Sequence, residues 1–403
     1  MTHSASSTES PSPVFAVKQV TAPQDTKAKV FGAFYTELHV AEFLVWWAVR
    51  SKHATVLDPC FGGGVFLECV CRRLSIFGGQ PPEQVYGVEL DPAAYAQVVR
   101  KLGPQFEIPL SHLIQSDFFS CEPEQLGPVD AVVGNPPFVR YHRFTGDART
   151  RALGRAHGEG VALSSLTSSW APFLVHAVSF LKHGGRLALV VPAELCHAGY
   201  ARPLLKFLAR SFQSVTILTF RQKLFPHLSQ DTLLLFAEGK GDPCSAFSWC
   251  DLPDGKALAG IMAAGGRQLP GICHLDIPAI SDGRQRLIEY LLPDPARSLY
   301  RRLATQGLAQ PLGSVADVGI GYVTGANAYF HLTPADAEHL GIPERYLQPA
   351  VFKAGALRGL SFTNSDWHAA ARSPRGAPHR GAPRESCRGG PLSSALFGRT
   401  AQP

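Results

Sequence analysis

Residues 129–138 read Val-Asp-Ala-Val-Val-Gly-Asn-Pro-Pro-Phe, and this stretch decides the fold class. Its first six residues form an apolar run that predicts a buried strand. The two prolines end that strand and fix the backbone, so Asn135 and Phe138 stand rigidly at its carboxyl end. In open α/β sheets, ligands bind at this edge. Taken alone, Asn135 to Phe138 is equally typical of a plain turn.

The chemistry of the tetrapeptide favours a flat ligand that carries an amino group. The Asn135 amide can accept a hydrogen bond from an amine, and the Phe138 ring can stack on a π-system. Together they suit a planar heterocycle with an exocyclic amine, such as adenine. What surrounds the tetrapeptide decides between this interpretation and a turn.

Three further predicted strands end in acidic residues, at Asp58, Glu89 and Asp117. A glycine-rich turn at 61–64 follows the first of them and leaves room for an adenosine-like group against the backbone. Glu89 is placed to accept both ribose hydroxyls, as an acidic residue does in dinucleotide folds. The Gly-x-Gly-x-x-Gly and Gly-x-x-x-x-Gly-Lys-Ser/Thr patterns are absent, which argues against an NAD or FAD site and against nucleoside triphosphate hydrolysis.

Predicted strands and helices alternate through most of the chain. The predicted strands are 55–58, 84–90, 112–117, 129–133, 186–192, 215–220 and 232–237. The predicted helices between them run to about 77, over 92–101, 168–182 and 200–211. This order predicts an α/β fold with a doubly wound, seven-stranded, mainly parallel sheet and helices on both faces.

Composition sets the class of protein. Hydrophobic residues make up 45% and charged residues 17% of the 403 residues, which is typical of a soluble protein with a sizeable core. The apolar run 43–49 is too short to span a membrane, and residues 1–28 are Ser/Thr/Pro-rich without a signal-peptide pattern. Nine cysteines without a Cys-x-x-Cys pair favour reduced thiols, and fifteen scattered histidines predict no metal site. We expect a cytoplasmic protein with no membrane partner.

The net charge of +6 is concentrated at one end of the chain. The tail 357–403 holds seven arginines, one Asp and one Glu and so contributes +5. The segment 139–160 forms a smaller basic patch, which we interpret as a Gly-containing loop just after Phe138. It is either an ordinary solvated loop or a phosphate contact beside the reactive site. The cations of this segment are Arg140, Arg143, Arg149, Arg151 and Arg155, against Asp147 and Glu159.

At this point the motifs, in their order, resemble an N6-adenine DNA methyltransferase of the gamma-class arrangement, as found in type II restriction–modification systems. The resemblance spans about residues 30–240 and implies a class I S-adenosylmethionine-dependent, Rossmann-like catalytic domain. It rests on Gly-Ala-Phe-Tyr-Thr at 32–36, Asp-Pro-Cys-Phe-Gly-Gly-Gly-Val-Phe-Leu at 58–67, Glu89, Asp117-Phe118, Asn135 to Phe138 and Leu-Phe-Pro at 224–226. Residues 321–327 more weakly resemble the opening of a target-recognition domain.

The resemblance assigns cofactor roles residue by residue. Thr36 would bind the methionine end of S-adenosylmethionine, and Asp58 with the glycine turn would hold its amino-acid portion. Glu89 would bind the ribose and Asp117 the adenine amine. The full cofactor set implied is Phe34, Tyr35, Thr36, Asp58, Pro59, Cys60, Gly62, Gly64, Glu89, Asp117, Phe118 and Pro137. Glu37 replaces the proline that the family carries after Phe-Tyr-Thr, which loosens this element without removing the role of Thr36.

The resemblance also assigns the catalytic and DNA-binding residues. The Asn135 side-chain oxygen and the Pro136 carbonyl would accept hydrogen bonds from the N6 amine of a flipped adenine. Phe138, in place of the commoner tyrosine, would stack on the base, with Phe225 on its other side. The catalytic set is Asn135, Pro136, Pro137 and Phe138, and the proposed DNA-backbone contacts are Arg140, Arg143, Arg149 and Arg151. The expected partners are double-stranded DNA and a cognate restriction endonuclease, with the methyltransferase itself monomeric.

The expected domain order leaves the C-terminal part incomplete. We expect a flexible arm (1–28), the catalytic domain (29–240), a connecting region (241–310), a partial target-recognition domain (311–368) and a disordered basic tail (369–403). The Asp294-Pro295 pair predicts the start of a helix that runs to about residue 306. The Arg/Pro/Gly-rich tail cannot bury enough surface to order itself, so we expect a truncated or frame-altered recognition domain. The alternative is a tail that binds the nucleic-acid backbone.

Other functions fit the same tetrapeptide. Asn-Pro-Pro-aromatic also serves enzymes that methylate rRNA guanine or the glutamine amide of release factors, because those reactions also need two acceptors around a planar amine. A catalytically inactive cofactor binder is an alternative from a different class. The Phe-Tyr-Thr element and the long segment after residue 240 favour DNA.

Overall fold

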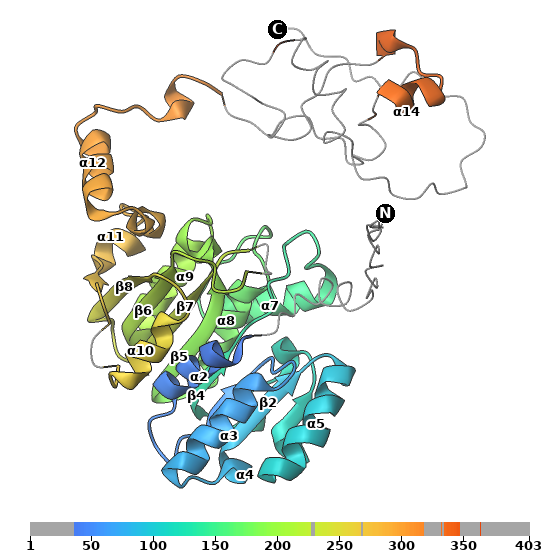
Figure 1. The fold of residues 1–403 in the computed structure, drawn as a ribbon, viewed down its shortest axis with the longest axis vertical. Helices are drawn as coiled ribbons and strands as arrows, with labels where there is room; N and C mark the ends of the chain where they lie inside the picture. The colour runs from blue at the N-terminus through green and yellow to red at the C-terminus, as the bar shows by residue number, and fades with distance from the viewer. Residues whose placement is uncertain are drawn as a thin grey trace, which may run out of the picture. The chain divides into compact units, whose positions relative to one another are not determined.

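The computed structural model describes residues 36–226, 230–266, 269–317, 332, 334–346 and 363. Within these residues the strands form one nine-stranded sheet with the order β3-β2-β1-β4-β5-β7-β6-β8-β9 (Figure 1). The strands are β1 (Val56–Asp58), β2 (Val85–Glu89), β3 (Leu113–Gln115), β4 (Val129–Gly134), β5 (Leu181–Pro192), β6 (Phe212–Phe220), β7 (Thr232–Lys240), β8 (Ala246–Leu252) and β9 (Cys273–His274).

Most of the strand pairs are parallel. β1 pairs in parallel with β2 and β4, β2 with β3, β4 with β5, and β6 with β8. The pairs β5–β7, β6–β7 and β8–β9 are antiparallel. The mainly parallel α/β sheet predicted from the sequence is therefore confirmed, and β8 and β9 are added to the seven strands that were expected.

The helices fill the connections between strands. The longer ones are α2 (Leu38–Ala48), α3 (Val65–Phe77), α5 (Pro92–Phe106), α7 (Gly146–Gly158), α8 (Trp170–Ser179), α9 (Ala201–Ser211) and α12 (Asp294–Thr305). The shorter ones are α4 (Pro81–Gln84), α6 (Pro123–Leu126), α10 (Ala257–Ala263) and α11 (Ile277–Ser281), with 3₁₀ turns η1 (Leu110–His112), η2 (Phe118–Ser120), η3 (Ala193–Cys196) and η4 (Leu287–Leu291).

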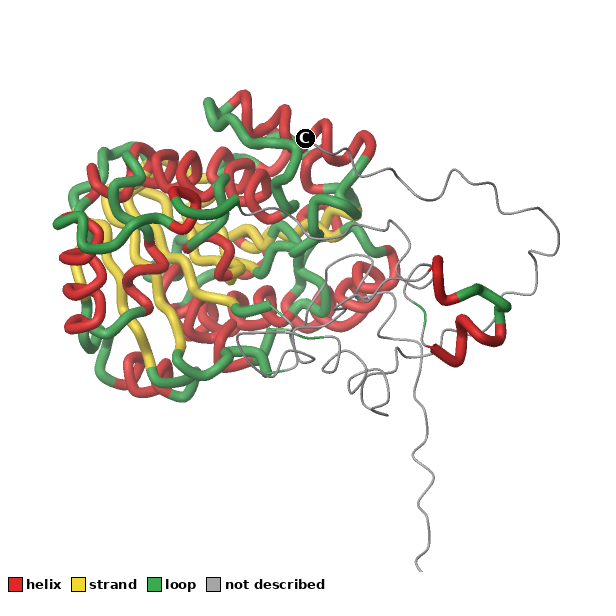
Figure 2. The backbone as a smooth tube through the Cα atoms, turned by 90° about the horizontal axis from the view of Figure 1, so that it is seen from above, coloured by secondary structure: helices red, strands yellow, loops and turns green. Residues whose placement is uncertain are grey.

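The sheet is wound in two directions from its middle. β1 leads through α3 to β2 on one side, and β4 leads through α7 and α8 to β5 on the other. Because such crossovers are right-handed, α3 and α8 cover opposite faces of the sheet. Figure 2 shows helices on both sides of the strands. The winding reverses between β1 and β4, and the carboxyl edge at such a switch point is where α/β folds bind ligands.

Burial explains the apolar runs of the sequence. In β4, the side chains of Val129, Ala131, Val132 and Val133 are fully buried, as expected for a parallel strand covered on both faces. Helix α8 is buried over Trp170–Val178, because it lies under α7 and beside α9 as well as on the sheet. These continuous apolar runs form one core on the two faces of the sheet.

Two of the longer helices were not predicted from the sequence. The apolar run 43–49 lies in α2 up to residue 48, and α2 packs against α3 and α10. The interpretation of 139–160 as a loop is wrong for Gly146–Gly158, which form α7. Three glycines lower the helix propensity of this segment. Tertiary packing outweighs that cost, because Ala152 and Ala156 are fully buried and α7 packs against α8.

The chain divides at Leu308 into two compact units. The described elements of the second unit are η5 (Leu312–Ser314), α14 (Pro334–His339) and η6 (Glu344–Tyr346). The predicted recognition motif at 321–327 and the basic tail from 369 lie outside the described residues. Among the described helices, none is long and apolar enough to cross a membrane.

Candidate active site

The carboxyl ends of β1 and β4 meet at the switch point. Asp58 is the last residue of β1, and Gly134 is the last residue of β4. A Cβ atom at Gly134 would stand 3.0 Å from Asp58 Oδ1 and 3.7 Å from Cys60 Sγ. Glycine therefore lets the two strand ends approach closely, which places Asn135 beside the turn that follows Asp58.

Asn135 joins three segments that are distant in sequence. Its side-chain nitrogen donates to Thr36 Oγ1 at 3.1 Å, across 99 positions of the chain. Its backbone carbonyl accepts a hydrogen bond from Cys60 Sγ at 3.3 Å. The structure thus brings together Thr36, the turn after β1 and the end of β4, as the sequence predicted. Phe34 and Tyr35, the other predicted residues of the N-terminal element, lie outside the described residues.

The glycine turn is held by the Glu89 carboxylate. Glu89 Oε2 accepts from the Gly62 backbone nitrogen at 2.7 Å, and Oε1 accepts from the Asp91 backbone nitrogen at 2.7 Å. Gly62 and Gly64 have φ angles of 49° and 82°, a region that favours glycine. Glu89 therefore shapes the turn, and its remaining lone pairs are still able to accept further hydrogen bonds.

Asp58 is a buried carboxylate with one unsatisfied oxygen. Its side chain is 0% exposed, and Oδ1 accepts from the Cys60 backbone nitrogen at 3.2 Å. Oδ2 has no hydrogen-bond partner among the described residues. Burial raises the pKa of the Asp58 carboxyl well above its usual value, and the Glu89 carboxylate raises it further. Such a group is a ready acceptor for a cationic ligand that enters the site.

Asp117 and Phe118 lie where η2 begins. Asp117 Oδ1 caps this turn by accepting from the Phe119 nitrogen at 3.1 Å, and Oδ2 accepts from Arg151 Nη2 at 2.9 Å. Phe118 is buried against the ring of Phe173, with ring centroids 4.8 Å apart. The sequence did not predict the ion pair with Arg151, which was expected to contact DNA.

His176 bonds the backbone of η2, a role that could not be predicted from the sequence. Its Nε2 lies 3.1 Å from the Phe118 carbonyl and 3.2 Å from the Cys121 carbonyl. Burial, with help from Arg155, lowers the pKa of His176 from 6.5 to about 4. The imidazole is therefore neutral near pH 7, and because both neighbours are acceptors, Nε2 carries the proton and donates to them.

Ser169 fixes the loop that follows Asn135 and was also missed. Its hydroxyl donates to the Pro137 carbonyl and accepts from the Val139 nitrogen at 2.9 Å, and its own nitrogen donates to the Val139 carbonyl at 3.0 Å. Ser169 occupies the N-cap position of α8, but its hydroxyl makes no capping bond. A serine before an apolar helix is a helix-start signal, and this signal could have drawn attention to it.

The two predicted aromatic walls are both buried. Phe138 and Phe225 are each 5% exposed. Phe225 lies in the β6–β7 loop, where Lys223 pairs with Asp231 at 3.1 Å. The roles of the two rings toward a base stay predictions. Residues 227–229 of this loop are outside the described part.

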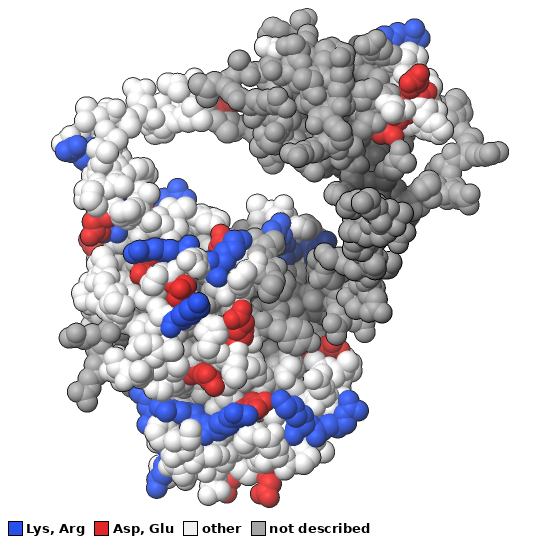
Figure 3. Space-filling model, in the orientation of Figure 1, with Lys and Arg blue, Asp and Glu red and all other residues white. Residues whose placement is uncertain are grey.

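Of the four arginines predicted to contact DNA, Arg140, Arg143 and Arg151 are exposed. Arg149 donates to the Ser165 carbonyl, and Arg151 pairs with Asp117. In Figure 3, basic and acidic side chains alternate over the visible face rather than forming one positive surface.

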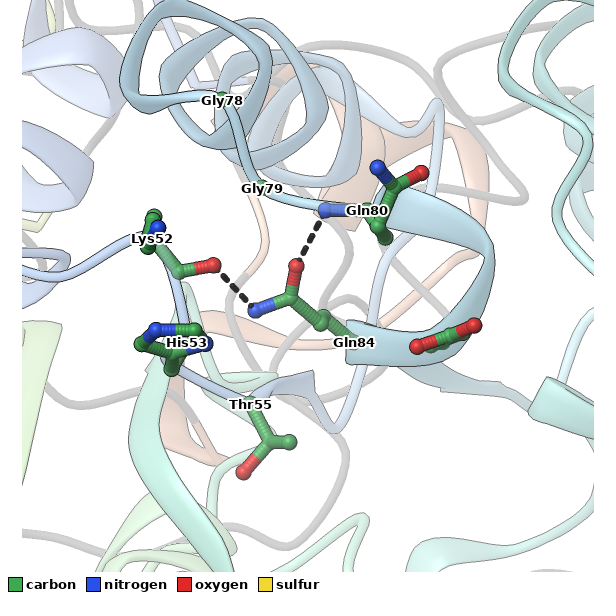
Figure 4. Close-up of a pocket in the computed structure, with 8 residues that line it drawn as sticks. Lys52, His53, Thr55, Gly78, Gly79, Gln80 and Gln84 are labelled. Carbon is green, nitrogen blue, oxygen red and sulfur yellow. Dashed lines mark hydrogen bonds between the residues drawn. The ribbon is translucent and has the colours of Figure 1, made fainter.

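A cavity of about 300 Å³ lies away from this site, before the amino ends of β1 and β2. Figure 4 shows the Gln84 side chain between Lys52 and Gln80. Gln84 accepts from the Gln80 nitrogen at 2.5 Å and donates to the carbonyls of Lys52 and Ala54 at 2.8 and 2.9 Å. These bonds use both N–H groups of the Gln84 amide, so the residue joins two loops. Among the described residues, no group of three or more metal-binding side chains is assembled.

Two family models match the chain in succession. The model for N-6 DNA Methylase matches residues 20–247, and the model for the C-terminal domain of Type II methyltransferase M.Eco57I matches residues 284–377. Type II methyltransferase M.XamI of Xanthomonas campestris pv. amaranthicola is 24% identical over 83% of this chain and 59% of its own length. M.HincII of Haemophilus influenzae is 23% identical over 54% of this chain and 39% of its own.

Solved structures show the same fold. The structure of the DrdV–DNA complex matches 63% of this chain and 31% of its own, with a TM-score of 0.52 at 13% identity. The type IIG restriction endonuclease BpuSI matches 80% of this chain and 41% of its own, also with a TM-score of 0.52, at 16% identity. The chain spans less than two thirds of the length of each of these relatives. The N-6 DNA Methylase model covers more than half of the 403 residues, and the matched part includes Asp58, Glu89 and Asn135. The chain therefore belongs to the N-6 DNA Methylase family.

Proposed function

We propose that the chain transfers a methyl group from S-adenosylmethionine to the N6 amine of adenine in duplex DNA, as part of a restriction–modification system. The observation that carries the proposal is the meeting of Thr36, Asp58 and Asn135 at the switch point of this family's fold. The names of M.XamI and M.HincII as Type II methyltransferases support the modification role. The DNA in the DrdV structure supports DNA as the substrate.

The residues at this edge fit S-adenosylmethionine. The buried Asp58 Oδ2, which has no partner among the described residues, matches an ammonium group such as that of the cofactor's methionine portion. Gly62 and Gly64 leave the backbone of the turn accessible, and Thr36 and Cys60 lie beside it. When bound, the cofactor supplies a methyl group activated by the sulfonium. We assign the remaining contacts to Phe34, Tyr35, Pro59, Glu89, Asp117, Phe118 and Pro137.

Asn135 and Pro136 would activate the amine. The lone pair of an N6 amine is delocalised into the adenine ring, which makes it a poor nucleophile. Two acceptors that draw on both N–H groups favour a pyramidal nitrogen whose lone pair is directed at the methyl group. Thr36 holds the Asn135 amide nitrogen and so fixes the rotation of the amide before substrate binds. Such pre-positioning is where a displacement of this kind gains most of its rate.

Phe138 and Phe225 would form the walls around the flipped base. Extruding a base costs a few kcal/mol, and stacking on an aromatic ring returns about 1–3 kcal/mol per base. Both rings are buried here, so they have to be uncovered before a base can stack on them. We infer that DNA binding opens this pocket.

We assign the DNA-backbone contacts to Arg140, Arg143, Arg149 and Arg151. Arg140 and Arg143 are exposed next to the catalytic loop and are placed to meet phosphates. Arg149 and Arg151 bond to Ser165 and Asp117, so we assign them a further role in holding α7 and Asp117. The proposed partners are duplex DNA and a separate restriction endonuclease, with a monomeric methyltransferase acting in the cytoplasm.

Tritiated methyl transfer to three substrates tests the proposal. Unmethylated duplex DNA, rRNA and a release factor are each incubated with the protein and labelled S-adenosylmethionine. We expect label on adenine of the DNA and on neither of the others. Label on rRNA or on the release factor instead would overturn the choice of DNA. Cofactor binding without any transfer would show a binder rather than an enzyme.

A further inference from the structure

A polar network lies next to the two loops that carry Phe138 and Phe225. We call Trp170, Glu194, Tyr200 and Gln230 the Glu194 network. The Glu194 carboxylate accepts from Trp170 Nε1 at 3.2 Å, from Gln230 Nε2 at 3.4 Å and from the Tyr200 hydroxyl. Trp170 Nε1 also lies 3.3 Å from the Tyr200 oxygen. One carboxylate thus joins the start of α8, η3, the residue before α9 and the β6–β7 loop.

One arm of the network leads to the loop of Phe138. Trp170 is 0% exposed, so its indole N–H needs an acceptor inside the protein. Trp170 directly follows Ser169, which holds Pro137 and Val139 by three hydrogen bonds. A shift of Trp170 would therefore move Ser169 and, through its hydrogen bonds, the backbone on both sides of Phe138.

The other arm leads to the loop of Phe225. Gln230 reaches Glu194 with its side chain, and the next residue, Asp231, accepts from the Ala193 nitrogen at 2.8 Å. Asp231 also pairs with Lys223, two residues before Phe225. The short segment Ala193-Glu194 therefore holds the β6–β7 loop through both its backbone and its side chain.

We propose that Glu194 is a positioning residue that sets the spacing between the Phe138 and Phe225 loops and thereby the width of the base pocket. This inference rests on the proposed function, which makes the two rings the walls of that pocket. Three donors converge on one carboxylate, and hydrogen bonds to a charged acceptor are stronger than neutral ones. Burial and the neighbouring Glu194 raise the pKa of Tyr200, which keeps its hydroxyl protonated as a donor at neutral pH.

The substitution Glu194→Gln tests the proposal because it keeps the shape and replaces one acceptor oxygen by a donor. We expect cofactor affinity within about twofold of wild type and a kcat for methyl transfer to DNA lower by about tenfold or more. Amide hydrogen exchange should become faster at 138–140 and at 221–225 and 230–231 together. Glu83→Gln, an exposed glutamate of α4 at the opposite edge of the sheet, is the matched control and should match wild type in every measurement.

A double-mutant cycle with Phe225→Ala separates positioning from general damage. If Glu194 acts through this ring, Glu194→Gln should cost much less in the Phe225→Ala background than in wild type. Equal losses in both backgrounds, or a wild-type kcat in Glu194→Gln, would overturn the proposal. Should Glu194→Gln fail to fold, Tyr200→Phe removes one donor only and must show the same loss of kcat at unchanged cofactor affinity.

The outcomes distinguish this inference from the proposed function. If the wild-type protein transfers no methyl group to DNA, the proposed function fails and the role in a base pocket falls with it. Hydrogen exchange then still decides whether Glu194 couples the two loops, because it needs no substrate. If wild type methylates DNA and Glu194→Gln exchanges as wild type does in both loops, only the inference fails.

Discussion

Asp58 is a single residue whose environment predicts a measurable effect on the cofactor. Its carboxylate is fully buried with Oδ2 unpartnered among the described residues. Asp58→Asn removes a buried charge, so the free energy of unfolding without cofactor should stay equal or rise by about 1 kcal/mol. Affinity for S-adenosylmethionine should fall at least about tenfold, because the loss of an opposite charge for the ammonium is uncompensated. Calorimetric titration measures this, and wild-type affinity in the variant would refute the role of Asp58.

His176 predicts how stability depends on pH. Its pKa is about 4 in the folded protein against an ordinary 6.5, so the folded state binds fewer protons between these values. The contribution of neutral His176 to the free energy of unfolding is therefore fully present above pH 6.5. It is lost as the pH falls toward 4, by on the order of 3 kcal/mol. Urea unfolding at pH 7 and pH 4.5 measures the loss.

The variant His176→Gln is the control for that prediction. Glutamine does not titrate, and its side-chain NH2 group can donate to the carbonyls of Phe118 and Cys121. The free energy of unfolding of His176→Gln should therefore fall less than that of wild type between pH 7 and pH 4.5. The same loss in both proteins would show that other groups cause it.

The residues proposed to bind the cofactor and the base could be predicted from the sequence. The residues that hold them in place could not. Thr36, Asp58 and Asn135 stand in motifs, and the structure brings them together. Ser169, His176 and Glu194 act through contacts across 24 to 58 positions of the chain. No local pattern encodes such contacts, because they depend on how α8 packs on the sheet.

Helix α3 shows how one element depends on the glycine at its start. Gly64 is the N-cap with a φ of 82°, and a Cβ there would lie 2.8 Å from the Val98 side chain on α5. Gly64→Ala should therefore lower the free energy of unfolding by about 1–3 kcal/mol through backbone strain and overlap. It should also weaken cofactor binding, since the turn 61–64 leads into this helix.

Gly154→Ala is the control, at an exposed position of α7. Gly154 is a helical residue, and a Cβ there would meet nothing within 4 Å beyond its chain neighbours and its own helix backbone. The substitution should raise the free energy of unfolding by up to about 1 kcal/mol, because alanine favours the helix. Chemical denaturation of both variants gives the comparison, and a destabilised Gly154→Ala with an unaffected Gly64→Ala would contradict it.

Elements with strong periodic patterns were predicted well, and those that depend on tertiary packing were not. The strands β1 to β7 lie where apolar runs ended in polar or turn residues. Helix α7 was missed because glycines and arginines dominate its sequence, while two buried alanines hold it in place. Helix α12 begins at Asp294, as expected.

At the scale of the whole molecule, the reversal of winding between β1 and β4 organises the site. Asp58, Glu89 and Asn135 all lie at the carboxyl edges of the strands beside that reversal. The alternation of strands and helices predicts this arrangement, because parallel neighbours end at the same edge. The extension of the sheet by β8 and β9 could not be predicted, since their sequence carries no motif and their place depends on pairing with β6.

The central claim is that Asn135 directs methyl transfer to an adenine amine in DNA. It is tested most directly by labelled methyl transfer to duplex DNA with wild type and Asn135→Ala, alongside cofactor binding. We expect Asn135→Ala to bind S-adenosylmethionine within about threefold of wild type and to lose about 100-fold or more of its transfer rate, as enzymes do when one transition-state hydrogen bond is removed. Near-normal methylation of DNA by Asn135→Ala would contradict the account.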